Sequence, residues 1–313
     1  MKKILAPLLA TFLLLIVMSF AASAAQIENT EFEPFWRIDT QNQAKLPRNF
    51  RTCEDEFKYD ADTLPSRQGL AALHMSGSAQ FSELEFNELI KALAGKENIV
   101  VVDLRQESHG LINGNGVSWY AKRNWGNLGK PSAQIIQEEE NLLHTANNQT
   151  ITATKLADSK HGQNQTIDMQ ITSALTEKEF LTAKHVGYLR LTATDHIAPN
   201  DESVDQFIQF YKSMPKNTWL HFHCQAGEGR TTTFMVMYDI LRNAKQVSFD
   251  DIVKRQYLLG GADLLQVKDN GSWKVEYVKK RIEFLKSFYA YVQQNPETLP
   301  VTWSKWQKAN SGK

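Results

Sequence analysis

This sequence has few cysteines, no formal net charge and only one long apolar segment. Only two cysteines occur among the 313 residues, Cys53 and Cys224, so the chain can form at most one internal disulfide. Lysine plus arginine number 35, as do aspartate plus glutamate, and the formal net charge is zero. This balance argues against nucleic acid as the main partner, and a polyanionic ligand would have to be attracted by a local basic cluster.

A single long apolar run lies at the N-terminus, from Ile4 to Phe20, and two lysines precede it. The small residues at 22–24 follow directly and match the cleavage pattern of a secretory signal peptide. A membrane anchor is the alternative, because the run approaches the length that spans a bilayer. We expect removal of residues 1–24 near Ala24 to give a soluble secreted or periplasmic protein without membrane contact. Loss of the two lysines leaves 33 basic against 35 acidic residues, a net charge of −2.

Apolar periodicity in the rest of the chain indicates an α/β domain. Hydrophobic residues make up 42% of the sequence and aromatic residues 10%, which is enough for a substantial buried core. Helical spacing predicts helices at 82–94, 201–214, 231–242, 248–259 and 273–294, and short apolar runs predict strands at 98–104, 186–191 and 219–223.

The middle of the chain has a different composition. Residues 109–175 are rich in Asn, Gln, Gly and Thr and contain short alternating stretches such as 150–154. Such stretches predict loops and small antiparallel strands. We therefore expect one main domain over 25–313, with a small β-rich inserted subdomain at about 110–185.

The segment HCQAGEGRT at residues 223–231 falls between a predicted strand and a predicted helix. A short loop entering a helix points its backbone N–H groups inward, where they and the helix dipole bind an anion. Gly227 and Gly229 allow tight curvature and close approach to phosphate oxygens. Arg230 adds a planar fork of donors that matches two phosphate oxygens. The segment therefore predicts a phosphate-binding loop.

The same features favour Cys224 as a nucleophile. A cysteine beside a helix N-terminus and an arginine is held as the thiolate, which is the reactive form. An inert buried cysteine is the alternative, but it would not need glycines and an arginine at these spacings. We expect His223 to order the loop by hydrogen bonding, unless it is simply a core histidine. Thr231 is placed to hydrogen-bond the sulfur, unless it only begins the helix.

This segment has the H-C-x5-R-T signature of the protein tyrosine phosphatase superfamily. The longer stretch HFHCQAGEGRTTTFMVM at 221–237 resembles its bacterial branch, the cysteine phytases or tyrosine-phosphatase-like myo-inositol polyphosphate phosphatases. The segments NFRT at 49–52, LHMSGSA at 73–79, VDLRQESHG at 102–110, VSWY at 117–120, ATDH at 193–196 and SWK at 272–274 resemble the same branch. The resemblance covers residues 35 to 306 and implies a core sheet flanked by helices, with the insert as a partial barrel. It also implies cysteine chemistry without a metal or other cofactor.

The resemblance also implies roles for individual residues. Asp195, which precedes Pro199 and alone would be an ordinary turn aspartate, falls where the family has its general acid. The loop residues expected to contact phosphate are Gln225, Ala226, Gly227, Glu228 and Gly229. The basic residues expected to face the pocket are Arg51, His196, Lys274, Arg281 and, on a looser match, Lys160 or His161. Each basic residue alone could be a solvated surface charge. Lys274 and Arg281 are seven apart on a predicted helix and so share a face.

Three positions depart from the family pattern. Glu228 places an acid in the phosphate-binding loop, Asn124 stands where relatives can have an aspartate, and Val278 stands where some have a substrate-facing tyrosine. These differences leave the chemistry intact but blur which phosphate is removed first. Cys53 would share a strand face with Arg51, which makes a reversible Cys53–Cys224 disulfide a hypothesis; a buried free thiol is the favoured alternative.

The sequence therefore predicts a metal-independent phosphomonoester hydrolase that acts on myo-inositol polyphosphates. A secreted protein tyrosine phosphatase is one alternative, and it would need a deep slot lined by aromatic residues in place of a wide basic pocket. An inactive phosphate-binding module is another, disfavoured because Cys224, Arg230 and Asp195 are all present.

Overall fold

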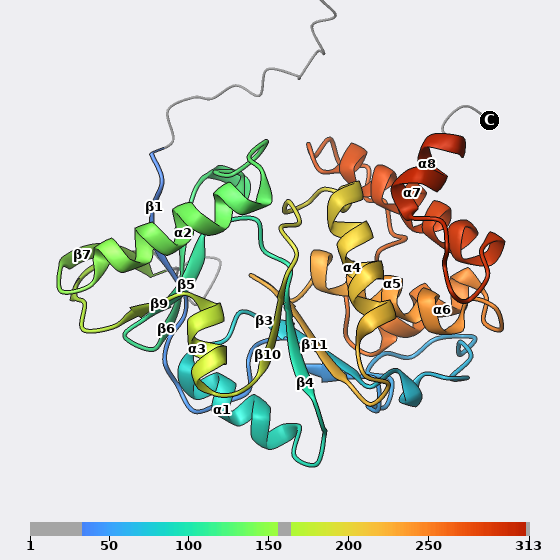
Figure 1. Ribbon diagram of the computed structural model, residues 1–313, viewed down its shortest axis with the longest axis horizontal. Helices are drawn as coiled ribbons and strands as arrows, with labels where there is room; N and C mark the ends of the chain where they lie inside the picture. Colours follow the sequence, from blue (N-terminus) through green and yellow to red (C-terminus); the bar gives the residue numbers. More distant parts are fainter. Residues whose placement is uncertain (1–32, 156–163, 311–313) are drawn as a thin grey trace, which may run out of the picture. The chain divides into compact units, whose positions relative to one another are not determined.

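A five-stranded sheet lies at the centre of the fold (Figure 1). The computed structural model describes residues 33–155 and 164–310, so the expected signal peptide and the pocket candidates Lys160 and His161 lie outside the described residues. The strand order is β10 (Gly187–Arg190), β4 (Ile99–Asp103), β11 (Trp219–Cys224), β3 (Met75–Ala79) and β2 (Arg51–Thr52). The first four strands are parallel and β2 is antiparallel to β3. All six residues of β11 are buried, as expected for a central strand covered on both faces.

The helices that follow β10 in the chain lie on one side of this sheet (Figure 1). They are α4 (Asp201–Ser213), α5 (Gly229–Asn243), α6 (Phe249–Leu258), α7 (Val275–Gln294) and α8 (Trp303–Asn310). The first four confirm the helices predicted from apolar spacing. Phe207 of α4 makes edge contacts with Phe222 of β11 and Phe234 of α5, at centroid distances of 5.9 and 5.5 Å. These rings belong to the main hydrophobic core, which fixes α5 against the strand that leads into it.

The opposite face of the sheet is covered by α1 (Glu83–Ala92) and α3 (Glu177–Ala183). Each begins with a capping box, in which the side chain of Ser82 or Thr176 and a glutamate three residues later satisfy free backbone N–H groups. A second core of Phe81, Phe86 and Phe180 with aliphatic neighbours packs beneath them. This core lies directly against His223, whose ring is 5.3 Å from that of Phe81.

A second sheet of six strands has the order β8-β7-β1-β6-β5-β9. Its strands are β8 (Gln165–Gln170), β7 (Thr150–Lys155), β1 (Phe35–Thr40), β6 (Asn115–Tyr120), β5 (His109–Ile112) and β9 (Ala174–Leu175). Strands β5 to β9 lie at 109–175, where a small β-rich antiparallel insert was expected, but the sheet that they form differs from the expectation in two respects. The strand β1 comes from outside that range, and it pairs with β7 in parallel.

A third difference is α2 (Ser132–Ala146), a 15-residue helix in a region predicted to hold only loops and strands. Its buried face consists of Ile135, Glu139, Leu143 and Ala146, which have helical spacing. Glu139 interrupts the apolar stripe because its carboxylate is needed for an internal ion pair with Arg190. No helix in the described residues is long and apolar enough to cross a bilayer.

Candidate active site

The phosphate-binding loop, residues 224–230, connects the end of β11 to the start of α5. Cys224 is 3% exposed, and the Thr231 hydroxyl donates a hydrogen bond to its Sγ at 3.2 Å. Gly227 has a φ of +73°, and a Cβ there would come within 2.4 Å of the backbone of Ser78 and Ala79. Only glycine fits this position without displacing β3.

Arg51 and Asn49 hold the loop from beneath. The Arg51 guanidinium donates to the Gly227 carbonyl at 2.9 Å and to Thr232 Oγ1 at 3.1 Å, while Asn49 Nδ2 donates to the Ala226 carbonyl at 2.8 Å. Arg51 is fully buried, and burial lowers its pKa to about 10. The prediction that Arg51 faces the pocket is therefore wrong. Its strand pairs with β3, which directs the side chain under the loop, where it satisfies a buried carbonyl.

Glu107 fixes the orientation of Arg230. Its carboxylate accepts two hydrogen bonds from the Arg230 guanidinium, at 2.6 and 2.8 Å, and a third from Arg105 at 2.9 Å. Burial by itself raises the pKa of Glu107, but Arg230 and Arg105 outweigh burial and hold the pKa well below its ordinary value. Sequence reasoning missed this role, although Glu107 lies in the VDLRQESHG segment directly after a predicted strand.

We expect Glu107→Gln to lower the free energy of unfolding by about 3–5 kcal/mol, because it removes a buried carboxylate that pairs with two buried arginines. Among the described residues, Arg105 then keeps only Asp39 as an acidic partner, and Arg230 keeps only Asp195. Chemical denaturation of the two proteins at neutral pH measures this difference. Glu54→Gln is the matched control, since Glu54 pairs with Lys96 at the surface and its loss should cost less than about 1 kcal/mol. Equal stability of Glu107→Gln and wild type would contradict the assigned role.

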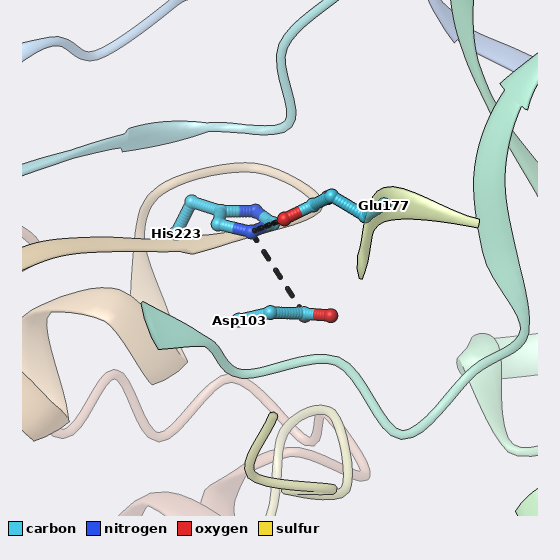
Figure 2. Close-up of side chains that lie close together, drawn as sticks. All are labelled: Asp103, Glu177 and His223. Carbon is cyan, nitrogen blue, oxygen red and sulfur yellow. Dashed lines mark hydrogen bonds and ion pairs between the residues drawn. The ribbon is translucent and has the colours of Figure 1, made fainter. Parts of the chain in front are cut away.

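His223 is anchored on the side of the loop that faces α3. Its Nε2 lies 2.8 Å from Glu177 Oε1 and 4.0 Å from Asp103 Oδ1 (Figure 2). The other Glu177 oxygen, Oε2, accepts a hydrogen bond from the Gln80 amide nitrogen Nε2 at 2.9 Å. Burial alone raises the pKa of Glu177, yet His223 outweighs it and lowers the pKa to about 2. The histidine before the nucleophile is thus tied to the first turn of α3.

The donor atoms of Asp103, Glu177 and His223 all lie within 4.8 Å of one another, a spacing that a metal ion could use. The Asp103 Oδ2, however, already accepts from the Tyr188 hydroxyl at 2.7 Å and pairs with His109 and Arg190, each at 3.1 Å. The Asp103 Oδ1 accepts from the Arg105 backbone N–H at 2.9 Å. Cations and donors therefore occupy the oxygens that a metal would need. We assign this cluster to holding His223 in place, not to metal binding.

Asp195 lies in the pocket wall next to Arg230, in the first turn of α5. Asn124 Nδ2 donates to its Oδ2 at 2.8 Å, and the Trp125 indole N–H donates to its carbonyl at 2.9 Å. The Arg230 Nε is 3.3 Å from Asp195 Oδ1. The carboxylate is 19% exposed and lines the same pocket as Cys224. The geometry brings the predicted general acid and nucleophile to one cavity.

A pocket of about 410 Å³ opens over the phosphate-binding loop. Of the loop residues predicted to contact phosphate, Gln225, Ala226, Glu228 and Gly229 line it. Gly227 does not, because it is pressed against the backbone of β3. The basic lining differs in membership from the predicted set and consists of Arg37, Arg123, His196, Arg230, Lys274 and Arg281.

His196, Lys274 and Arg281 thus lie where the sequence placed them. Arg281 donates to the His196 carbonyl at 2.8 Å, and burial lowers the pKa of both side chains. Arg37 and Arg123 were not anticipated. Arg37 and Asp39 are two residues apart in β1 and therefore share one face of the strand. Such a pair is also common on an exposed strand, so the sequence alone does not indicate that Arg37 lines a pocket.

Cys53 is remote from Cys224. Its backbone N–H bonds the carbonyl of Met75, which is opposite Leu220 in the β3–β11 ladder, whereas Cys224 is opposite Ala79. Four residues of strand span about 13 Å, while disulfide-bonded Cα atoms lie less than about 7 Å apart. The hypothesis of a Cys53–Cys224 disulfide is therefore wrong. Cys53 is a buried free thiol, and burial raises its pKa to about 11.

A parallel sheet whose central strand enters a buried helix through a C-x5-R loop defines a protein of the tyrosine phosphatase class. A family model named PTP-like phytase matches residues 102–242, and its description reads "Inositol hexakisphosphate". A PTP-like phytase structure from Bdellovibrio bacteriovorus is 36% identical, with a TM-score of 0.68 over 87% of this chain and 94% of that one. The chain belongs to the PTP-like phytase family.

Two further relatives are longer than this chain. The PTP-like myo-inositol phosphatase from Mitsuokella multacida, in complex with myo-inositol-(1,3,4,5)-tetrakisphosphate, is 39% identical with a TM-score of 0.83. The match covers 89% of this chain and 50% of that one. Effector protein hopD2 of Pseudomonas syringae pv. tomato is 28% identical over 82% of this chain and 56% of its own length. The chain thus spans about half the length of these relatives.

Proposed function

We propose that this protein is a metal-independent phosphomonoesterase that hydrolyses inositol polyphosphates. The observation that carries the proposal is the arrangement of Cys224, Arg230 and Asp195 around one pocket with an excess of basic side chains. Family membership and the inositol tetrakisphosphate bound to the Mitsuokella relative support the same substrate class.

In the first step, the Cys224 thiolate attacks phosphorus in line and forms an S–P bond while the P–O bond to the inositol breaks. Asp195 donates its proton to the leaving oxygen, so the inositol departs as a neutral alcohol. The Glu107 carboxylate holds the Arg230 guanidinium through Nη1 and Nη2. The Nε edge of the guanidinium, next to Asp195, acts with the loop N–H groups to stabilise the charge on the three phosphoryl oxygens.

In the second step, water attacks the phosphoryl group of the cysteinyl-phosphate. The Asp195 carboxylate accepts a proton from that water, the S–P bond breaks, and inorganic phosphate and the thiolate are released. The Thr231 hydroxyl, 3.2 Å from Sγ, stabilises the departing thiolate by hydrogen bonding. The cycle restores both groups and requires no metal ion.

Basic side chains of the pocket that have no carboxylate partner favour a polyphosphate substrate over a phosphotyrosine peptide. In the described residues, none of Arg123, Lys274 and Arg281 forms an ion pair with a carboxylate, although all three line the pocket. Concentrated positive charge of this kind attracts a ligand with several phosphate groups and offers little to a single phosphate on an aromatic ring. The lone acid in the loop, Glu228, moderates this charge without cancelling it.

The test is the initial rate of phosphate release by the purified protein, with inositol hexakisphosphate or a phosphotyrosine peptide as substrate and with excess chelator. We expect faster release from the inositol phosphate, unaffected by the chelator. Preference for the peptide would indicate a tyrosine phosphatase, and no release from either would indicate a binding module. Loss of activity in chelator would contradict the metal-free mechanism.

We also propose that the protein is exported after cleavage near Ala24, on the strength of the N-terminal lysines, apolar run and small residues. The intact mass of the protein recovered outside the cytoplasm measures this directly. A mass that still includes residues 1–24 would contradict cleavage.

A further inference from the structure

Two consecutive non-glycine residues, Arg123 and Asn124, adopt left-handed backbone conformations in the turn after β6. Their φ angles are +63° and +62°. This conformation is unfavourable for residues with a Cβ, and strain of this kind concentrates at functional sites. The turn directs Asn124 to Asp195, as described above, and it brings Arg123 to the same pocket. Holding Asp195 explains Asn124 but leaves Arg123 without a role.

Arg123 lies over two indole rings. Its guanidinium carbon is 4.0 Å from the ring centroid of Trp273 and 5.1 Å from that of Trp125. The rings contact each other edge to face at 5.5 Å, and Trp125 is fixed by its hydrogen bond to the Asp195 carbonyl. Cation–π contacts of this kind hold a guanidinium in place.

Trp273 also contacts a second cation, the ammonium group of Lys274. The Lys274 Nζ is 5.6 Å from the Trp273 ring centroid, and the His196 ring packs edge-on against Trp273 at 5.1 Å. Among the described residues, no carboxylate forms an ion pair with Arg123 or Lys274. Aromatic contacts fix the two cations without using their N–H groups, which stay available to an anion.

We infer that Arg123, held on the indoles of Trp125 and Trp273, is a ligand for a second phosphate group of the substrate. The first phosphate occupies the loop at Cys224, and the guanidinium fork of Arg123 binds a neighbouring phosphate on the same ring, with Lys274 beside it. Trp273 is the positioning residue of this site. The inference rests on the proposed function and extends it, because it requires a substrate with at least two phosphates.

The test compares inositol hexakisphosphate with 4-nitrophenyl phosphate, which has only one phosphate group. For Arg123→Met we expect KM for the inositol substrate to rise roughly 10- to 100-fold, the effect of losing charge-assisted hydrogen bonds. The loss in kcat/KM on 4-nitrophenyl phosphate should be at least about tenfold smaller, since this ester has no second phosphate to lose. Arg67→Met is the control, because Arg67 stacks on Phe57 outside the pocket.

Trp273→Leu should reproduce the selective rise in KM, and Trp273→Phe should restore part of the affinity because a π face remains. This pair carries the test if Arg123→Met does not fold. Equal losses on both substrates, or an unchanged KM for inositol hexakisphosphate, would overturn the second phosphate site alone. Wild-type protein that hydrolyses only 4-nitrophenyl phosphate would overturn the proposed function and the site with it.

Discussion

Cys224→Ser is expected to abolish turnover while leaving substrate binding intact. A serine hydroxyl at the end of β11 is not ionised near neutral pH and is a poor nucleophile toward a phosphate ester. Loss of a covalent nucleophile lowers kcat by about 10⁴–10⁶. The loop N–H groups, Arg230 and the basic side chains of the pocket are unchanged, so the affinity for inositol hexakisphosphate should stay close to that of the wild type.

Phosphate release measures the first expectation, and titration calorimetry of Cys224→Ser with inositol hexakisphosphate measures the second. Cys53→Ala is the matched control. Cys53 is a buried thiol whose strand register places it about 13 Å from the loop, so its removal should leave kcat within about twofold. Normal turnover in Cys224→Ser would eliminate the cysteinyl-phosphate mechanism, and inactivation by Cys53→Ala would give Cys53 a role that its position does not explain.

Sequence reasoning succeeds where function depends on residues close together in the chain. The strand that ends at Cys224, the tight loop and the helix from Gly229 are one continuous segment, so spacing alone indicates an anion site with a thiolate. The helices predicted on one side of the sheet follow from apolar spacing, which is also local. The structure agrees with these expectations within a few residues.

Sequence reasoning fails where the role of a residue depends on a partner far away in the sequence. Glu107 fixes Arg230, which is 123 positions later, and Arg51 supports Gly227, which is 176 positions later. Neither an acid after a strand nor an arginine before a cysteine reveals such a partner. Arg51 looked like a pocket residue because family likeness identifies a basic side chain but not the direction in which it points.

The helix α2 was missed for a related reason. Glu139 sits in the middle of its apolar face because Arg190 needs a buried counter-charge, and that tertiary requirement overrides the binary pattern. Arg123 was missed because nothing in the KRNW segment signals a left-handed turn at an arginine. Both cases are local exceptions imposed by contacts with distant parts of the chain.

Asp195→Asn is expected to lower kcat/KM for inositol hexakisphosphate by about 10²–10⁴, the usual contribution of a positioned general acid. An amide keeps the shape of the side chain and its contact with Asn124, but it cannot protonate an alkoxide. The loss in kcat/KM on 4-nitrophenyl phosphate should be less than about tenfold, because nitrophenolate leaves without a proton and kcat/KM reports the steps up to phosphoenzyme formation.

The second step should behave differently in the same variant, because water still needs a base when it attacks the cysteinyl-phosphate. With 4-nitrophenyl phosphate, Asp195→Asn should therefore release a rapid burst of nitrophenol equal to the enzyme concentration and then turn over slowly. Mass spectrometry of the quenched protein should detect the phosphoryl group on Cys224. Asp250→Asn, at an exposed position in the first turn of α6, is the control. Equal losses on both substrates without a burst would mean that Asp195 only orders the loop, and that another group carries the proton.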